Sequence, residues 1–337
     1  MMRTLLWIVL GLACIVGVPG LARVSAANST PLRIAILAPA GSTWDKVFRA
    51  WSNTLNKETG GALSFQLFMG GVAGDERDVI RKMKLAQLDG GLLTSVGLGQ
   101  VARPTMVLQM PGILENYKQL NQVREKLASD FEGMFAKEGY ALLGWGDAGF
   151  LRQFAKKPIL RPEDLKTTRP WVPRDDPALP ELMKVIGANG VPLGIPEVFP
   201  ALQTGMVDAV TVSAIAAIAL QWFRYLTYMS KQAPVAIVAG TIVREEAIKG
   251  LAPDHAKILF DSGKKAHATL IEQLVKEDEK AYKTLLGRGI KEFDAFATPE
   301  QKKAWDALYA EVTKRLTGKL WTKDLLDKVK AAAVGAK

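Results

Sequence analysis

Apolar residues along the chain fall into two recurring patterns, short continuous runs and helical spacings. Residues 32–37 form a short apolar run typical of a buried strand, and 62–68 form a second one. Between the two runs, apolar residues recur at helical spacing: Trp44, Val47, Phe48, Trp51 and Leu55. A strand, a helix and a strand in this order favour a parallel sheet that is covered by helices.

The alternation continues to Gly149 and then begins again. Before Gly149 it predicts helices at 76–87 and 117–137 and strands near 91–94, 105–108 and 140–145. After Gly149 it predicts strands at 150–154, 171–172, 191–193 and 207–212, and helices at 178–186, 197–204 and 214–229. An apolar strand-like stretch at 233–243 and a helix at 253–286 follow. The last helix is long enough to run across two lobes.

The chain is therefore expected to be an α/β protein with two lobes. We expect residues 27–149 and about 235–285 to form lobe I. Residues 150–234 and about 286–320 are expected to form lobe II, and 321–337 a basic C-terminal helix or tail.

The first 26 residues have the features of a secretory signal peptide. Arg3 supplies the positive start, residues 5–14 are an apolar run, and 24–26 are a small-residue cleavage site. We therefore expect cleavage after this site and an exported, periplasmic protein. Acylation at Cys14, as in a lipoprotein, is the alternative.

Cysteine and charge exclude several classes of protein. Cys14 is the only cysteine, so the cleaved chain has no thiol for a disulfide, a metal site or a nucleophile. The formal net charge is +10, but Lys and Arg are interspersed with Asp and Glu along helical stretches such as 272–291. We interpret these charges as solvated helix faces and expect no nucleic-acid partner.

Familiar cofactor and catalytic motifs are missing or misplaced. Gly144, Gly146 and Gly149 match G-x-G-x-x-G, but a strand follows them where a dinucleotide site needs a helix, so we expect a crossing between the lobes. His255 and His267 lie more than three turns apart on one predicted helix and cannot share a metal. The sequence has no H-E-x-x-H, G-x-S-x-G or Walker motif. We expect no enzyme activity, cofactor or metal.

Three sequence blocks resemble one family of transport proteins. They are GGVAGDERDVIRKMKLAQLDG (70–90), KPILRPEDLK (157–166) and EVFPALQTGMVDAV (197–210). The chain resembles, over about residues 32–311, the substrate-binding subunit of tripartite ATP-independent periplasmic (TRAP) transporters, the DctP-type receptors. The resemblance implies a two-lobed periplasmic binding protein fold with crossing strands and a long helix that spans both lobes. It also implies a small-molecule ligand and membrane permease subunits as partners, and leaves a soluble accessory protein open.

The polar side chains that hold a carboxylate in that family are replaced here. By the resemblance, one carboxylate-binding arginine falls at Trp171, a second at Leu151 and an asparagine at Val212. Arg152 is one position off and is therefore expected on the opposite face of its strand. A carboxylate buried without a fork of donors loses its hydration with little in return, at a penalty of roughly several kcal/mol.

The expected ligand is therefore hydrophobic or weakly polar and lies between the lobes of a non-enzymatic receptor. Its expected contacts are Trp44, Phe150, Leu151, Arg152, Trp171, Phe199 and Val212. Two alternatives stay open. One is a conventional organic-acid receptor that uses Arg152 or Arg169, and the other is an exported carrier or interaction protein without transport.

Overall fold

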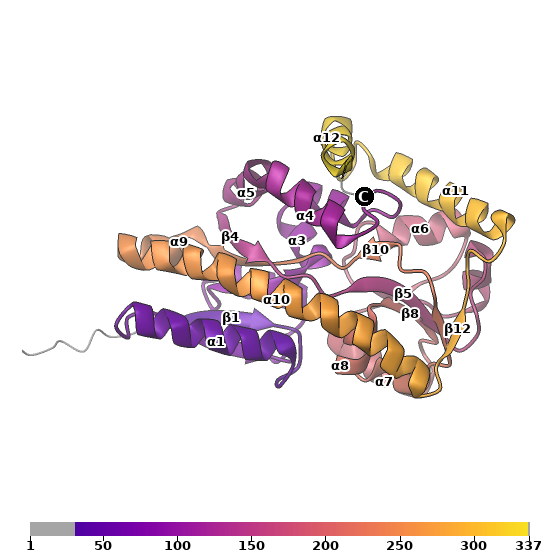
Figure 1. The fold of residues 1–337 in the computed structure, drawn as a ribbon, viewed down its shortest axis with the longest axis horizontal. Helices are drawn as coiled ribbons and strands as arrows, with labels where there is room; N and C mark the ends of the chain where they lie inside the picture. The colour runs from indigo at the N-terminus through magenta and orange to yellow at the C-terminus, as the bar shows by residue number, and fades with distance from the viewer. Residues whose placement is uncertain (1–30, 336–337) are drawn as a thin grey trace, which may run out of the picture.

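Two five-stranded sheets, each with its own helices, form two lobes in the computed structural model, which describes residues 31–335 (Figure 1). The expected signal peptide and Cys14 lie outside the described residues. The predicted two-lobed α/β fold is confirmed.

The lobe I sheet has the strand order β2-β1-β3-β11-β4. The first three strands are parallel, and β11 runs antiparallel to both β3 and β4. The strands are β1 (Leu32–Ile36), β2 (Phe65–Met69), β3 (Gly90–Thr94), β4 (Tyr140–Trp145) and β11 (Ala239–Arg244). The helices of this part of the chain are α1 (Thr43–Glu58), α2 (Glu76–Lys84), α3 (Ser95–Val101), α4 (Tyr117–Lys126), α5 (Ala128–Lys137) and α9 (Glu245–Lys249).

The lobe II sheet is built around β5, which pairs with β8, β9 and β10. A bridge between Pro170 and Ala209 places a two-stranded sheet, β6 and β7, beside β8. The strands are β5 (Phe150–Ala155), β6 (Trp171–Pro173), β7 (Val191–Leu193), β8 (Ala209–Val212), β9 (Tyr228–Ser230), β10 (Val235–Ala236) and β12 (Lys291–Phe293). The helices are α6 (Leu179–Ile186), α7 (Ile195–Thr204), α8 (Ala214–Ala219) and α11 (Pro299–Leu316).

Helices cover both faces of the lobe II sheet, as the alternation of buried residues shows. Trp171 and Val210 pack in the core with α7 and α8, whereas their neighbours Val172 and Ala209 pack in the core with α6 and α11. Successive side chains of a strand point to opposite faces, so these helix pairs lie on opposite sides. Figure 1 shows α7 and α8 below β5 and β8, and α6 and α11 above them.

Two hydrogen-bonded segments and one long helix connect the lobes. Residues 146–149 lead from β4 to β5 and lie beside 237–238, which lead from β10 to β11. The amide of Gly146 donates to the carbonyl of Ala239 at 2.8 Å, and that of Ile237 donates to the carbonyl of Gly149 at 2.8 Å. The 35-residue α10 (Pro253–Gly287) packs against α1 in lobe I and α8 in lobe II (Figure 1).

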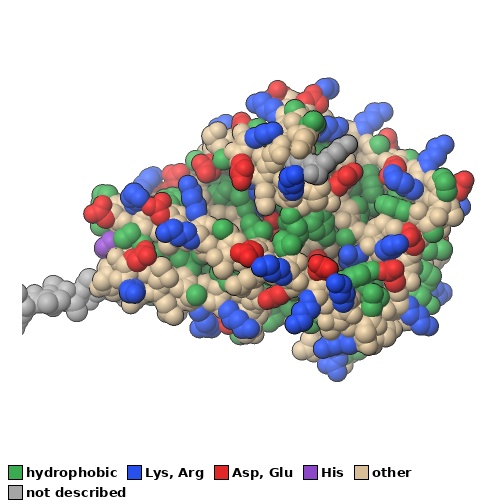
Figure 2. Space-filling view, in the orientation of Figure 1, with side chains coloured by type: hydrophobic (Ala, Val, Ile, Leu, Met, Phe, Trp, Pro, Cys, Tyr) green, Lys and Arg blue, Asp and Glu red, His purple; other side chains and the backbone are tan. Residues whose placement is uncertain are grey.

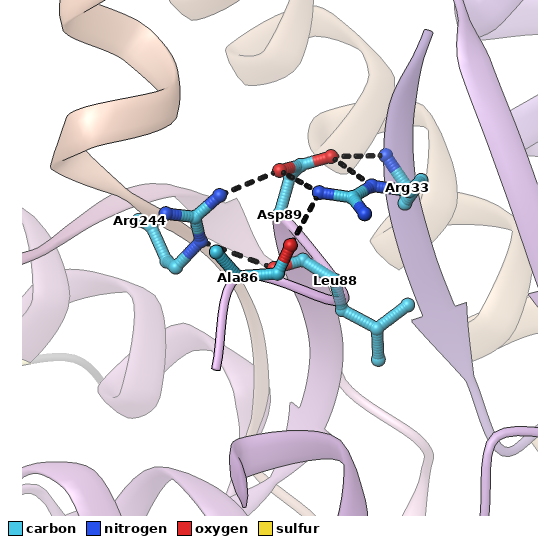
Figure 3. Close-up of polar contacts among 5 residues, drawn as sticks. All are labelled: Arg33, Ala86, Leu88, Asp89 and Arg244. Carbon is cyan, nitrogen blue, oxygen red and sulfur yellow. Dashed lines mark hydrogen bonds and ion pairs between the residues drawn. The ribbon is translucent and has the colours of Figure 1, made fainter. Parts of the chain in front are cut away.

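The buried carboxylate of Asp89 stabilises the turn between α2 and β3 inside lobe I (Figure 3). Asp89 accepts hydrogen bonds from Nε of Arg33 at 2.9 Å and from Nη2 of Arg244 at 2.7 Å. The same two guanidinium groups also donate to the carbonyls of Ala86 and Leu88. This cluster therefore connects β1, β3 and β11, far from the surface that faces lobe II.

Three predicted elements were wrong. The predicted strand at 105–108 is part of the 3-10 helix η1 (Arg103–Gln109), because a short apolar run with Pro104 ahead of it also suits a helical turn. The predicted helix at 117–137 is two helices that meet at Leu127. The predicted helix at 214–229 stops at Ala219, since Gln221 takes a left-handed φ of 59°, and the 3-10 helix η3 (Trp222–Tyr225) and β9 follow.

The chain returns to lobe I at its C-terminal end. A helix, α12 (Lys323–Ala333), packs against α4 and η1 of lobe I. The side-chain amide of Gln122 on α4 donates to the carbonyl of Ala332 at 2.7 Å. The connection from α11 to α12 is therefore a fourth passage between the lobes.

Candidate functional site

A cavity of about 290 Å³ lies between the lobes. Lobe I contributes the residues at the carboxyl ends of β1 and β3, and lobe II contributes the ends of β6, β7 and β8 and the start of β5. Ligands of α/β proteins bind in this kind of crevice outside the strand ends. Figure 2 shows hydrophobic side chains above α10 in the middle of this face, with charged side chains of both signs scattered over the rest.

Four of the seven residues expected at the site line the cavity. They are Trp44, Leu151, Trp171 and Val212. Trp44 comes from α1 in lobe I, and the other three come from strands of lobe II. The structure thus brings together, at one cavity, residues that lie up to 168 positions apart in the sequence.

The other three expected residues, Phe150, Arg152 and Phe199, are not among the cavity-lining residues. Arg152 points to the opposite face of β5, where its Nη1 donates to the carbonyls of Ser230 and Lys231, and its guanidinium lies 4.1 Å from the ring centre of Tyr282. Leu151 and Gln153, on either side of Arg152, point to the other face of β5 and line the cavity.

The two phenylalanines pack against other aromatic rings. The ring of Phe150 lies 4.7 Å from that of Tyr117, and the ring of Phe199 lies 5.4 Å from that of Tyr225. Arg169, the other arginine considered for an organic acid, is an exposed residue that pairs with Asp208 at 2.9 Å. Neither Arg152 nor Arg169 is placed to hold a ligand in this cavity.

Trp171 presents an apolar surface because its only polar atom is already bonded. The indole Nε1 donates to the carbonyl of Leu193 on the neighbouring strand β7 at 2.9 Å. The indole ring packs edge-to-face on Trp222 from η3, with ring centres 5.0 Å apart at 78°. Trp171 is therefore held rigidly and has no hydrogen-bond donor left for a ligand.

The charged residues of the cavity wall are mostly acidic, and the sequence analysis missed them. Asp75, Glu76 and Asp176 line the cavity, and Arg174 is the only Lys, Arg or His among the described lining residues. Arg174 donates to Glu197 at 2.6 Å. Burial raises the pKa of Asp75 and Asp176 above their usual range. Asp75 and Glu76 stand within the 70–90 block, and Arg174 directly follows β6.

Glu76, the first residue of α2, places its buried carboxylate at the N-terminus of α3. Its carboxylate accepts hydrogen bonds from the amide of Thr94, from the Thr94 hydroxyl at 2.8 Å and from the amide of Gly97 at 3.0 Å. Burial raises the pKa of Glu76 to about 7, although these donors oppose the shift. Glu76 therefore orders the β3–α3 turn that forms the lobe I wall.

The lobes touch at the rim of the cavity. A Cβ at Gly194 would lie only 2.5 Å from the carboxylate of Asp75, so lobe I and lobe II approach closely just before α7. Arg77 of lobe I pairs with Asp175 of lobe II at 3.6 Å. These contacts close the rim around the cavity.

The part of the chain that the structure describes offers no cluster of three or more His, Cys, Asp or Glu side chains for a metal ion. His267 lies in the lobe I core, where Nε2 contacts the Thr241 hydroxyl at 2.8 Å and Nδ1 contacts the Gly263 carbonyl. Burial lowers the pKa of His267 to about 4. None of the helices within 31–335 has the length and apolar content to cross a membrane.

Two α/β lobes with one cavity between their strand ends form the fold of a periplasmic binding protein, in which a small molecule lies between the lobes. The chain belongs to the bacterial extracellular solute-binding proteins, family 7, also called DctP, whose family model matches residues 34–319. The expected family is thereby confirmed.

The chain is also similar to individual proteins in sequence and in fold. An uncharacterized protein of Haemophilus influenzae is 27% identical over 198 residues, 57% of each chain. A TRAP periplasmic solute-binding protein of Xanthobacter autotrophicus, with bound β-D-galacturonate, has a TM-score of 0.80 and 22% identity and covers 89% of this chain and 99% of its own. One of Desulfovibrio salexigens, with bound orotic acid, has a TM-score of 0.82 and 17% identity over 91% of this chain and 99% of its own.

Proposed function

We propose that this protein is the periplasmic receptor of a TRAP-type transport system and binds an apolar or weakly polar small molecule in the interlobe cavity. It delivers this ligand to membrane permease subunits. The observation that carries the proposal is Trp171, whose indole N–H donates to Leu193 and whose ring packs on Trp222 where a carboxylate-binding guanidinium is expected.

The charges of the cavity wall favour an uncharged ligand. Among residues 31–335, three carboxyl groups, those of Asp75, Glu76 and Asp176, line the cavity with a single guanidinium, that of Arg174, which already pairs with Glu197. A carboxylate ligand would have to leave water for a site where acidic groups outnumber basic ones. Such a transfer without a paired cation is unfavourable by several kcal/mol.

The ligand contacts in this proposal are Trp44, Leu151, Trp171 and Val212, which bring apolar surface from both lobes. Burial of apolar ligand surface against them contributes about 25 cal/mol per Å². The aromatic ring of Trp171 also offers an edge or a face to a ring or chain of the ligand. Affinity in this proposal comes from area and shape, not from a charge pair.

An organic acid is the second candidate, because Arg174 lines the cavity and the two structural relatives described above hold galacturonate and orotic acid. In this case the Arg174 guanidinium would exchange Glu197 for the ligand carboxylate. The arginine of this alternative would therefore be Arg174 in place of Arg152 or Arg169.

Native mass spectrometry of the protein purified without detergent tests the proposal. A retained species that an organic solvent extracts, together with no binding of galacturonate or orotate in calorimetry, is the expected result. Binding of either acid, abolished in Arg174→Gln and retained in Arg169→Gln, would instead establish the second candidate.

A further inference from the structure

We infer that the ligand is elongated and carries one polar group, with part of it between the lobes and the rest inside lobe II, between the sheet and helices α6 and α11. This inference rests on the proposed apolar ligand and specifies its shape. It follows from the cavity wall, which continues well beyond the interlobe cleft: Leu182, Met183, Phe296, Trp305, Tyr309 and Val312 also line it.

These six residues lie on the face of the lobe II sheet opposite to α7 and α8. Met183 and Trp305 belong to the core that contains Val172 and Ala209, whereas Trp222 belongs to the core that contains Trp171. The cavity thus has walls on both faces of the lobe II sheet. Its two parts join beyond the carboxyl end of β6, where the sheet stops. A compact sugar acid would occupy only the part between the lobes.

The sheet side of this inner part carries polar side chains. Gln153 on β5 and Thr211 on β8 are register partners and therefore share a face, and both line the cavity. The side-chain oxygen of Gln153 is buried and has no hydrogen-bond partner. A buried acceptor without a partner is costly, and a hydroxyl or amide of the ligand would satisfy it.

Two other polar side chains of the cavity wall, Ser230 and Gln232, already have partners. The Ser230 hydroxyl donates to the backbone carbonyl of Gln232 at 2.8 Å and accepts from the backbone N–H of Gln153 at 2.9 Å. The side-chain oxygen of Gln232 accepts from the amide of Ala295 at 2.9 Å. Gln153 is therefore the group that we assign to the polar end of the ligand.

The helix side of the inner part is apolar and held in place. The indole N–H of Trp305 donates to the carbonyl of Leu160 at 3.2 Å, and its ring packs at 5.9 Å from that of Tyr309. Arg315 on α11 pairs with Glu181 on α6 at 3.5 Å and joins the two helices. A flexible hydrocarbon chain suits this wall, whereas a second charged group does not.

Binding of linear 1-alkanols, from butanol to decanol, tests the inference by calorimetry on the full chain. In the wild type, affinity should rise with each added methylene, by up to about fourfold when the methylene is fully buried. Leu182→Trp places a bulky indole ring in the inner part, so the affinity should stop rising at a shorter alkanol. Lys184→Trp puts the same ring on the exposed side of α6 and should behave as the wild type.

Gln153→Leu tests the polar group separately. This substitution should lower the affinity for every alkanol by a similar factor of about tenfold, since one hydrogen bond is lost whatever the chain length. Thermal unfolding of each variant verifies that it is folded.

The possible outcomes separate the inference from the proposed function. If the alkanols bind, but their affinities for Leu182→Trp and for the wild type stop rising at the same chain length, the inference of an elongated ligand is wrong. The proposed apolar ligand between the lobes is then still supported. If no alkanol binds while galacturonate or orotate does, the proposed function itself is wrong.

Discussion

The guanidinium of Arg124 and the carboxylate of Asp147 form a two-pronged ion pair in the interior, with hydrogen bonds of 2.8 and 2.5 Å. Arg124 belongs to α4 of lobe I, and Asp147 belongs to the segment that leads to lobe II. The Arg124 guanidinium also stacks on Trp145 at 4.6 Å. The pair therefore ties α4 of lobe I to the segment that leads into lobe II.

Asp147→Asn should destabilise the protein strongly, because it leaves the Arg124 charge buried without a counter-charge. The expected loss in the free energy of unfolding is about 3–5 kcal/mol. Urea unfolding measures it. The double variant Arg124→Met, Asp147→Leu should recover most of the loss, and equal stability of Asp147→Asn and wild type would contradict the role of the pair.

Glu76 should make stability fall as pH rises from about 4.5 to 7. Its pKa is raised from 4.5 to about 7 by burial, so the native state holds a proton that the unfolded chain releases across this range. The free energy of unfolding of the wild type, relative to Glu76→Gln, should decrease by roughly 3 kcal/mol from pH 4.5 to 7. Unfolding curves at four pH values measure this difference, and a flat difference would show that Glu76 is ionised throughout.

Asp89 should make stability increase as pH rises, which is the opposite of the effect of Glu76. Burial alone would raise the pKa of Asp89, but hydrogen bonds from Arg33 and Arg244 outweigh it and hold the pKa below 3.8. The stabilisation is therefore present above about pH 4 and is lost as pH falls through the lowered pKa.

Asp89→Asn should lower the free energy of unfolding by about 2 kcal/mol at pH 7, and the difference should shrink below pH 4. Glu272→Gln removes an exposed pair with Lys276 and is the matched control, with no measurable effect expected. A constant difference down to pH 2 would exclude the proposed charge effect.

Trp171→Ala should lower the affinity for an apolar ligand by about tenfold to a hundredfold, because the large apolar ring is removed from the cavity wall. Phe199→Ala is the control, since Phe199 packs on Tyr225 away from the cavity and its removal should leave affinity unchanged. Displacement of the fluorescent probe N-phenyl-1-naphthylamine measures both variants. Equal losses in the two variants would indicate general loosening of lobe II in place of a ligand contact.

Local patterning in the sequence predicted much of the architecture. The helical spacing from Trp44 to Leu55 and the apolar runs around it correspond to α1, β1 and β2, because periodicity depends only on neighbouring residues. The strand alternation also placed Leu151 and Arg152 on opposite faces correctly. Short apolar runs such as 105–108 were ambiguous, since four buried residues suit a 3-10 turn as well as a strand.

The sequence by itself determined the two α/β lobes and the family, because strand and helix periodicities and the residues within each of the three blocks are properties of nearby residues. Only the tertiary structure decided which side chains surround the cavity. Arg174, which follows β6, pairs with Glu197 of α7. Trp305 lines the same cavity as Trp171, 134 positions earlier in the chain, because α11 packs against α6. Such contacts depend on how distant elements pack, and no spacing along the chain specifies them.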